Sequence, residues 1–150
     1  MKTILINKLK DHTALIGIVG LGYVGLPLAL RYLEVGYPVL GLDVDQSKVD
    51  QLQAGQSYIK HIPAEPIHEN IQSGNLQCST DFARAREADA LILCVPTPLD
   101  RHREPDLSFV ISSLEKILPH LCPGQVVYWT PGVYLMLLRA KYIRDDHFAD

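Results

Sequence analysis

An eighteen-residue stretch, 13–30, contains no charged side chain but holds four glycines and one proline. It follows a short basic segment with Lys2, Lys8 and Lys10, so its composition alone would suit a signal peptide or a membrane anchor. The glycines and the proline argue against one continuous apolar helix. We therefore expect a buried strand, a tight turn and a helix start here, and no membrane segment.

Apolar runs alternate with helix-like segments along the rest of the chain. Strands are expected at 14–19, 39–42, 90–95 and 125–128, with a weaker one at 76–79. Helices are expected at 23–35, 46–54, 66–73 and 107–118, with a short one at 81–86. The first and third apolar runs lack polar alternation, as is typical of strands covered on both faces. The pattern predicts an α/β fold with a parallel sheet, in one domain over residues 1–150.

The ends of these elements carry further signals. Gly36, Gly55 and Gly74 each follow an expected helix, where a left-handed C-cap would end it. The segment 96–106 holds three prolines and five charged residues and is predicted to be an exposed loop. Because it follows the carboxyl end of an apolar strand, we expect it at the edge where open α/β sheets bind ligands.

The hexapeptide GLGYVG at 20–25 lies directly between the first expected strand and the first expected helix. Gly20 permits the tight turn, Gly22 lets the backbone approach a pyrophosphate, and Gly25 lets the helix pack closely on the strand. The unpaired amides at the helix start, with the positive end of its dipole, would then face the phosphates. The motif in this context predicts a Rossmann-like, doubly wound sheet in three αβα layers that binds a dinucleotide.

A second signal is Asp43, which follows the second expected strand eighteen residues after Gly25. A carboxylate at this spacing accepts hydrogen bonds from the adenosine ribose and repels a 2′-phosphate, so NAD is favoured over NADP. The alternative is a helix N-cap or a solvated charge, although Asp45 is better placed to cap the next helix. Lys48 is either a contact to the adenosine side of the cofactor or an ordinary surface lysine. Thr97 is either a cofactor contact or a turn threonine that bonds its own backbone.

Composition excludes several classes of function. A net charge of -3 with 21% charged residues provides no basic surface for nucleic acid. Cys78, Cys94 and Cys122 are odd in number and form no CxxC pair, so they predict neither a disulfide framework nor a zinc or other metal site. They fit a reducing cytoplasm, and Cys94 is expected to be a small buried hydrophobe rather than a reactive thiol.

Four blocks of the sequence match a known enzyme family in order and spacing. They are IGIVGLGYVGLPLA at 16–29, GLDVD with KV at 41–49, GQSYIKHI at 55–62, and CVPTPL with REPDLS at 94–108. With these blocks, residues 14–125 resemble the opening of the UDP-glucose/GDP-mannose dehydrogenase family. The third and fourth blocks resemble the branch that oxidises UDP-N-acetylglucosamine, or its galacto epimer, more than the UDP-glucose branch.

This resemblance implies an enzyme that oxidises the C6 alcohol of a UDP-sugar to a carboxylate in two hydride transfers, using two NAD and a thiohemiacetal on a cysteine. The product would supply bacterial surface polysaccharide. The resemblance also implies a set of cofactor contacts in this chain: Gly20, Gly22, Tyr23, Val24, Gly25, Asp43, Lys48, Val95, Pro96 and Thr97.

The sequence departs from the family pattern after residue 125. The family continues with a Ser-Thr-Thr-x-Pro-Gly-Thr-Thr motif, whereas residues 128–133 here are YWTPGV. Thr130 therefore does not inherit the role of the catalytic threonine. Residues 126–150 are interpreted as a divergent tail, with helical spacing of apolar residues from 133 onwards.

The family's nucleophilic cysteine, with its lysine and asparagine helpers, would lie beyond residue 150, so no catalytic residue is predicted here. The UDP-binding domain and the helix that forms the family dimer would lie there too. The sequence therefore does not decide whether this chain forms a homo-oligomer. We expect the chain to bind NAD without turning over a UDP-sugar. The alternative is a free-standing NAD-sensing or regulatory module, while VPTPL at 95–99 argues against a hydroxyacid-type dehydrogenase.

Overall fold

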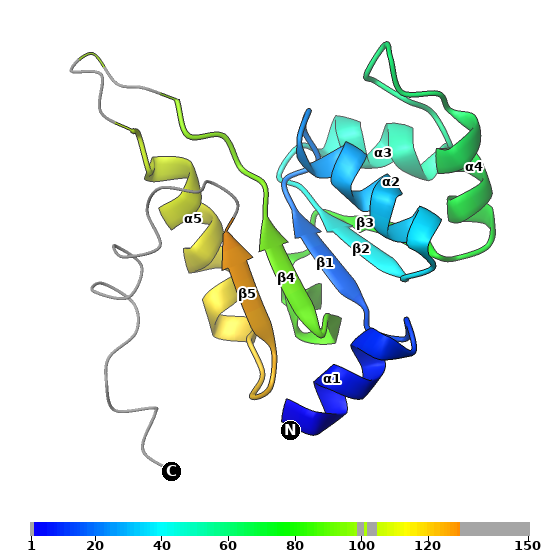
Figure 1. Cartoon of the computed structure of the whole chain (residues 1–150). Helices are drawn as coiled ribbons and strands as arrows, with labels where there is room; N and C mark the ends of the chain where they lie inside the picture. The colour runs from blue at the N-terminus through cyan, green and yellow to red at the C-terminus, as the bar shows by residue number, and fades with distance from the viewer. Residues whose placement is uncertain (1, 99–100, 102–104, 130–150) are drawn as a thin grey trace.

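Five parallel strands form one sheet at the centre of the computed structural model, which describes residues 2–98, 101 and 105–129 (Figure 1). The strands are β1 (Ile16–Val19), β2 (Val39–Leu42), β3 (Leu76–Ser79), β4 (Ala90–Leu93) and β5 (Val126–Trp129). Their order across the sheet is β3-β2-β1-β4-β5, with every neighbouring pair parallel. The chain order changes direction between β1 and β4, which is where doubly wound sheets bind ligands.

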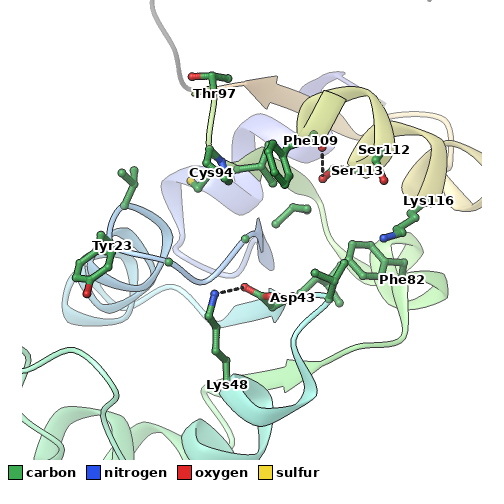
Figure 2. Close-up of a pocket in the computed structure, with 18 residues that line it drawn as sticks. Tyr23, Asp43, Lys48, Phe82, Cys94, Thr97, Phe109, Ser112, Ser113 and Lys116 are labelled. Carbon is green, nitrogen blue, oxygen red and sulfur yellow. Dashed lines mark hydrogen bonds and ion pairs between the residues drawn. The ribbon is translucent and has the colours of Figure 1, made fainter. Parts of the chain in front are cut away.

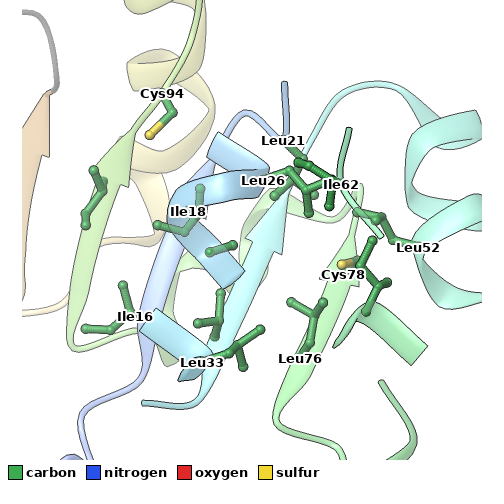
Figure 3. Packing of buried hydrophobic residues seen from close by; sticks show 14 of the residues in the cluster. Ile16, Ile18, Leu21, Leu26, Leu33, Leu52, Ile62, Leu76, Cys78 and Cys94 are labelled. Atoms are coloured by element: carbon green, nitrogen blue, oxygen red, sulfur yellow. The ribbon is translucent and has the colours of Figure 1, made fainter. Parts of the chain in front are cut away.

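Helices cover both faces of this sheet (Figure 1). On one face lie α2 (Gly25–Val35), α3 (Gln46–Gln53) and α4 (Glu65–Gln72), whose buried side chains form one core cluster with Ile16 and Ile18 of β1 (Figure 3). On the other face, α5 (Ser108–Ile117) and the 3-10 helix η1 (Phe82–Glu87) form a second cluster with Leu40 and Leu91. A short 3-10 turn, η2 (Leu118–His120), follows α5. The predicted three-layer, doubly wound fold is confirmed.

The central strands are covered on both sides. All four residues of β1 and of β2 are buried, and three of the four in β4. Each fully buried leucine or isoleucine, such as Ile18 or Leu91, contributes about 1.5–3 kcal/mol to the free energy of folding. The absence of polar alternation in the sequence of these strands follows from this double cover.

The expected elements are present, with small shifts at their ends. The helix expected at 23–35 is α2, which begins at Gly25 because residues 22–24 form the turn that leads into it. Gly36, Gly55 and Gly74 have φ of 100°, 71° and 77°, which confirms the predicted left-handed helix ends. The short helix expected at 81–86 is η1, capped by the side chain of Asp81.

One helix, α1 (Lys2–Lys10) at the N-terminus, was not expected from the sequence. Its nine residues are too few to be stable in isolation. Tertiary contacts hold it at the amino end of the sheet: Lys8 Nζ lies 2.7 Å from Asp89 Oδ1, and the Tyr37 hydroxyl donates to the Leu9 carbonyl at 2.6 Å. Periodicity alone could not identify a helix whose stability comes from these distant partners.

The apolar stretch 13–30 folds as predicted into the end of a connection, strand β1, a turn and the start of α2. None of the described helices has the length and apolar character that a bilayer span requires. The predicted loop 96–106 is described only at residues 96–98, 101 and 105–106, where Asp106 N–H donates to the Pro98 carbonyl. The helical spacing predicted from residue 133 lies outside the described residues.

Asp89 offers a test of how the N-terminal segment is fastened to the sheet. Its carboxylate accepts hydrogen bonds from the Leu15 amide at 2.9 Å and from Lys8 Nζ at 2.7 Å. Asp89→Ala should lower the free energy of unfolding by about 1.5–3 kcal/mol, since charge-assisted bonds are lost and a partly buried amide loses its acceptor. Urea denaturation measures the loss. The control is Glu34→Ala, which removes an exposed pair with Arg31 and should cost at most about 0.5 kcal/mol; equal losses would contradict the prediction.

Candidate cofactor-binding site

A cavity of about 800 Å³ opens at the carboxyl ends of β1, β2 and β4 (Figure 2). The residues that directly follow these strands line it, namely Gly20, Asp43 and Cys94. Its position between β1 and β4 is the switch point of the sheet. Nine of the ten predicted cofactor contacts line this cavity: Gly20, Gly22, Tyr23, Val24, Asp43, Lys48, Val95, Pro96 and Thr97.

Gly25 is the predicted contact that does not line the cavity, and its place in the structure explains why it is glycine. A Cβ at Gly25 would lie 1.7 Å from the Gly20 carbonyl oxygen and 3.2 Å from Cys94 Cβ. Gly20 itself has φ of +93°, a conformation that favours glycine. These two glycines let α2 begin directly against the ends of β1 and β4, as the sequence predicts for a tight turn and close packing.

Gly22 is different from its two neighbours in the motif. Its φ is not in the left-handed region, and a Cβ built there would meet no heavy atom within 4 Å. Neither backbone strain nor crowding inside the described part of the chain requires a glycine here. Because Gly22 lines the cavity, the space in front of its backbone is available to a ligand.

The amides of the turn divide into two groups. Gly20 N–H donates to the Leu42 carbonyl and Leu21 N–H donates to Asp43 Oδ2, both at 2.7 Å. The amides of Gly22, Tyr23 and Val24 have no acceptor among the residues that the structure describes. They stand at the N-terminus of α2, whose N-cap Val24 offers no side-chain cap, so the positive end of the helix dipole faces the cavity.

Asp43 is buried, with 6% of its surface exposed, at the floor of the cavity. Its Oδ2 accepts the Leu21 amide, its Oδ1 accepts the Asp45 amide at 3.0 Å, and Lys48 Nζ lies 3.8 Å from Oδ2 (Figure 2). Asp45, not Asp43, is the N-cap of α3, where it accepts the Ser47 amide. Two carboxylate oxygens hold about four lone pairs, so Asp43 retains capacity to accept hydrogen bonds from a ligand.

The loop after β4 supplies the other wall of the cavity. Val95 and Thr97 are partly buried, and Pro96 between them is exposed. The Thr97 hydroxyl makes no hydrogen bond to any other described residue. Among these residues it therefore does not bond the backbone of its own turn, which was the alternative to a cofactor contact.

A second group of lining residues was not foreseen: Phe82 from η1, and Phe109, Ser112, Ser113 and Lys116 from α5 (Figure 2). The four on α5 are spaced i, i+3, i+4, i+7 and therefore share one side of the helix. Lys116 Nζ lies 5.5 Å from the centroid of the Phe82 ring, which closes this end of the cavity. The helical spacing was available in the sequence, but it did not indicate that this side faces a ligand.

Two of the three cysteines, Cys78 and Cys94, are buried and have the environment of unreactive thiols. Cys94 is 8% exposed, as predicted for a small buried hydrophobe. Burial raises the pKa of the Cys78 thiol to about 12. Cys122 is exposed, and all three are free cysteines. Within the described residues, no group of three or more His, Cys, Asp or Glu side chains could hold a metal ion.

Comparison with known proteins identifies the family to which this domain is similar. The model of the UDP-glucose/GDP-mannose dehydrogenase family, NAD binding domain, matches residues 14–135. A UDP-N-acetyl-D-mannosamine dehydrogenase of Methanococcus maripaludis is 40% identical over a 119-residue alignment that covers 73% of this chain and 26% of the relative. The protein of the same name from Escherichia coli K12 is 36% identical over 115 residues, 76% of this chain and 27% of the relative.

Solved structures with the same fold carry related names. The UDP-N-acetyl-mannosamine dehydrogenase Cap5O from Staphylococcus aureus superposes with a TM-score of 0.68 at 35% identity, over 77% of this chain and 28% of that one. A ternary complex of GDP-mannose dehydrogenase from Pseudomonas aeruginosa gives a TM-score of 0.70 at 30% identity, with the same coverage of 77% and 28%. The chain thus spans about a quarter of the length of the relatives it matches. It belongs to the UDP-glucose/GDP-mannose dehydrogenase family and carries that family's NAD-binding domain.

Proposed function

We propose that this chain is the cofactor-binding part of a dehydrogenase that oxidises C6 of a UDP-N-acetylhexosamine to the uronate with two NAD. The names of its relatives support the substrate class, since several are UDP-N-acetyl-D-mannosamine dehydrogenases. These names favour the manno epimer over the gluco or galacto epimer suggested by the SYIKHI and REPDLS blocks. Such a product would serve surface polysaccharide synthesis, and the three free cysteines fit a cytoplasmic location.

The observation that carries the proposal is the glycine at position 22. No neighbouring atom in the described part of the chain and no unusual φ accounts for it, and its amide, like those of Tyr23 and Val24, has no acceptor there. A backbone that must approach a phosphate closely requires both features. The protein's own residues therefore fit the NAD that the family implies.

Each wall of the cavity suits one portion of the cofactor. The amides of Gly22, Tyr23 and Val24 would bind the diphosphate, and Asp43, with Lys48 beside it, would bind the adenosine ribose. The aromatic and hydroxyl side chains at the η1 and α5 end would contact the adenine. Val95, Pro96 and Thr97 would form the wall on the side of β4. NAD would supply the hydride acceptor, and the residues described here would hold and orient it.

Two alanine substitutions in the glycine turn separate the needs of the ligand from those of the fold. Gly22→Ala places a methyl group in open space, so the free energy of unfolding should stay level or rise by up to about 1 kcal/mol. NAD affinity should fall about tenfold or more, equivalent to about 1.4 kcal/mol. Gly25→Ala places a methyl group against the Gly20 carbonyl and should lower stability by about 3 kcal/mol or more. Calorimetric titration and urea denaturation measure the two effects; unchanged NAD affinity in Gly22→Ala would remove the role proposed for this residue.

Asp43 should decide between NAD and NADP. The unaltered chain should bind NAD and bind NADP much more weakly, because a buried carboxylate repels a 2′-phosphate. Asp43→Asn should weaken NAD binding and narrow the difference between the two cofactors. Asp45→Asn is the matched control, since it makes the same change at a residue that caps α3, and asparagine caps helices equally well. Equal affinity of the unaltered chain for both cofactors would refute the role of Asp43.

The activity of the whole protein can be tested on the product of the complete gene. With UDP-N-acetylmannosamine, UDP-N-acetylglucosamine, UDP-N-acetylgalactosamine and UDP-glucose as candidates, one of the acetylated sugars should give two NADH per sugar, measured by absorbance and mass spectrometry. A preference for UDP-glucose would contradict the proposed substrate class. NAD binding without oxidation of any of the four would favour the alternative of an NAD-sensing module.

A further inference from the structure

The carbonyl of Leu21, in the middle of the glycine turn, accepts a hydrogen bond from the hydroxyl of Tyr58. Tyr58 lies 37 residues further along the chain, in the connection between α3 and α4, and is partly buried against the first core cluster. The Leu21 amide donates to Asp43 Oδ2 at 2.7 Å. Both backbone polar groups of Leu21 are therefore held by side chains from other segments of the fold.

The side chain of Leu21 is fixed as well. It is fully buried in the first core cluster, beside Leu26 and Ile62 (Figure 3). A Cβ at Gly41 of β2 would lie 2.9 Å from both Leu21 Cδ atoms, which shows how closely this side chain packs on the strand. The residue that precedes Gly22 is thus held at its amide, its carbonyl and its side chain.

The hydrogen bond at the Leu21 carbonyl has a consequence for the next amide. A trans peptide group directs its C=O and its N–H in opposite directions, and none of the described peptide bonds is cis. The peptide group that carries the Leu21 carbonyl also carries the Gly22 amide. Holding the carbonyl toward Tyr58 therefore directs the Gly22 N–H away from Tyr58. Gly22 lines the cavity, and its amide has no acceptor in the described part of the chain.

We propose that Tyr58 is a positioning residue for the cofactor, whose hydroxyl orients the Leu21-Gly22 peptide group so that the Gly22 N–H points at the bound diphosphate. This inference rests on the proposed NAD site. It gives the SYIKHI block, residues 57–62, a role at the phosphate turn, although the block lies outside the glycine motif and its tyrosine does not line the cavity.

The chemistry of the hydroxyl suits a fixed donor. Burial, with the nearby Asp43 carboxylate, raises the pKa of Tyr58 above its ordinary value. The phenol therefore keeps its proton at neutral and moderately alkaline pH. A carbonyl oxygen can only accept a hydrogen bond, so the Tyr58 hydroxyl must be the donor and the Leu21 carbonyl the acceptor. This fixed direction favours one orientation of the Leu21-Gly22 peptide group.

The test removes one hydroxyl and compares ligands with and without a diphosphate. Tyr58→Phe keeps the ring and its packing. Tyr37→Phe is the matched control, because its hydroxyl also donates to a backbone carbonyl, that of Leu9, but lies outside the cavity. Dissociation constants for NAD, ADP and adenosine are measured by ¹H–¹⁵N NMR titration of each chain. Tyr58→Phe should weaken NAD and ADP about two- to tenfold, the worth of one hydrogen bond, and leave adenosine unchanged. Tyr37→Phe should change none of the three.

Equal affinities of Tyr58→Phe and the unaltered chain for NAD and ADP would overturn this inference and leave the proposed NAD site intact. An equal loss for adenosine would overturn it too, since it would indicate general damage to the fold. Failure of the unaltered chain to bind NAD would overturn both proposals. If Tyr58→Phe does not fold, the Gly22 amide resonance of the unaltered chain decides: ADP should shift it and adenosine should not, and an unmoved resonance with ADP bound would overturn the inference.

Discussion

The close approach of α2 to the end of β1 is the constraint on which the rest of the site depends. The Gly20 carbonyl oxygen occupies the space that a side chain at Gly25 would need, so the helix can begin there only with glycine at that position. This contact places the N-terminus of α2 directly over the switch point between β1 and β4. Gly22, Tyr23 and Val24, whose amides have no acceptor among the described residues, then line the cavity.

The turn is also held from outside the motif, and this couples the cofactor site to the core. Asp43 accepts the Leu21 amide, and Tyr58 donates to the Leu21 carbonyl. Asp43 therefore has a structural task beside the one proposed at the ribose, and its carboxylate is almost fully buried. These two hydrogen bonds restrict the conformations of the turn, which lowers the entropy cost of ordering it when a ligand binds.

Much of the fold could be predicted because its signals are local. The apolar strands, the glycine at each of three helix ends and the GLGYVG turn can each be recognised within a few residues. The α1 helix could not be recognised in this way, because its stability comes from contacts of Lys8 and Leu9 with residues far along the chain. In the site, the predicted contacts nearest the strands line the cavity, while Phe82 and the cavity-facing side of α5 were missed. Their spacing is that of any amphipathic helix, and only the packing of α5 on the sheet shows where that side points.

The residue pattern is sufficient to predict the alternation of strands and helices, the position of the phosphate turn and the acid that follows β2, because backbone conformation and burial at these places depend on the residues present there. Which polar groups meet depends instead on how distant segments pack. It assigned Asp45 rather than Asp43 to the cap of α3, brought Tyr58 to the Leu21 carbonyl, and left Gly22 with empty space before it. These are contacts, or missing contacts, between segments distant in sequence, and their geometry exists only once the two faces of the sheet are packed.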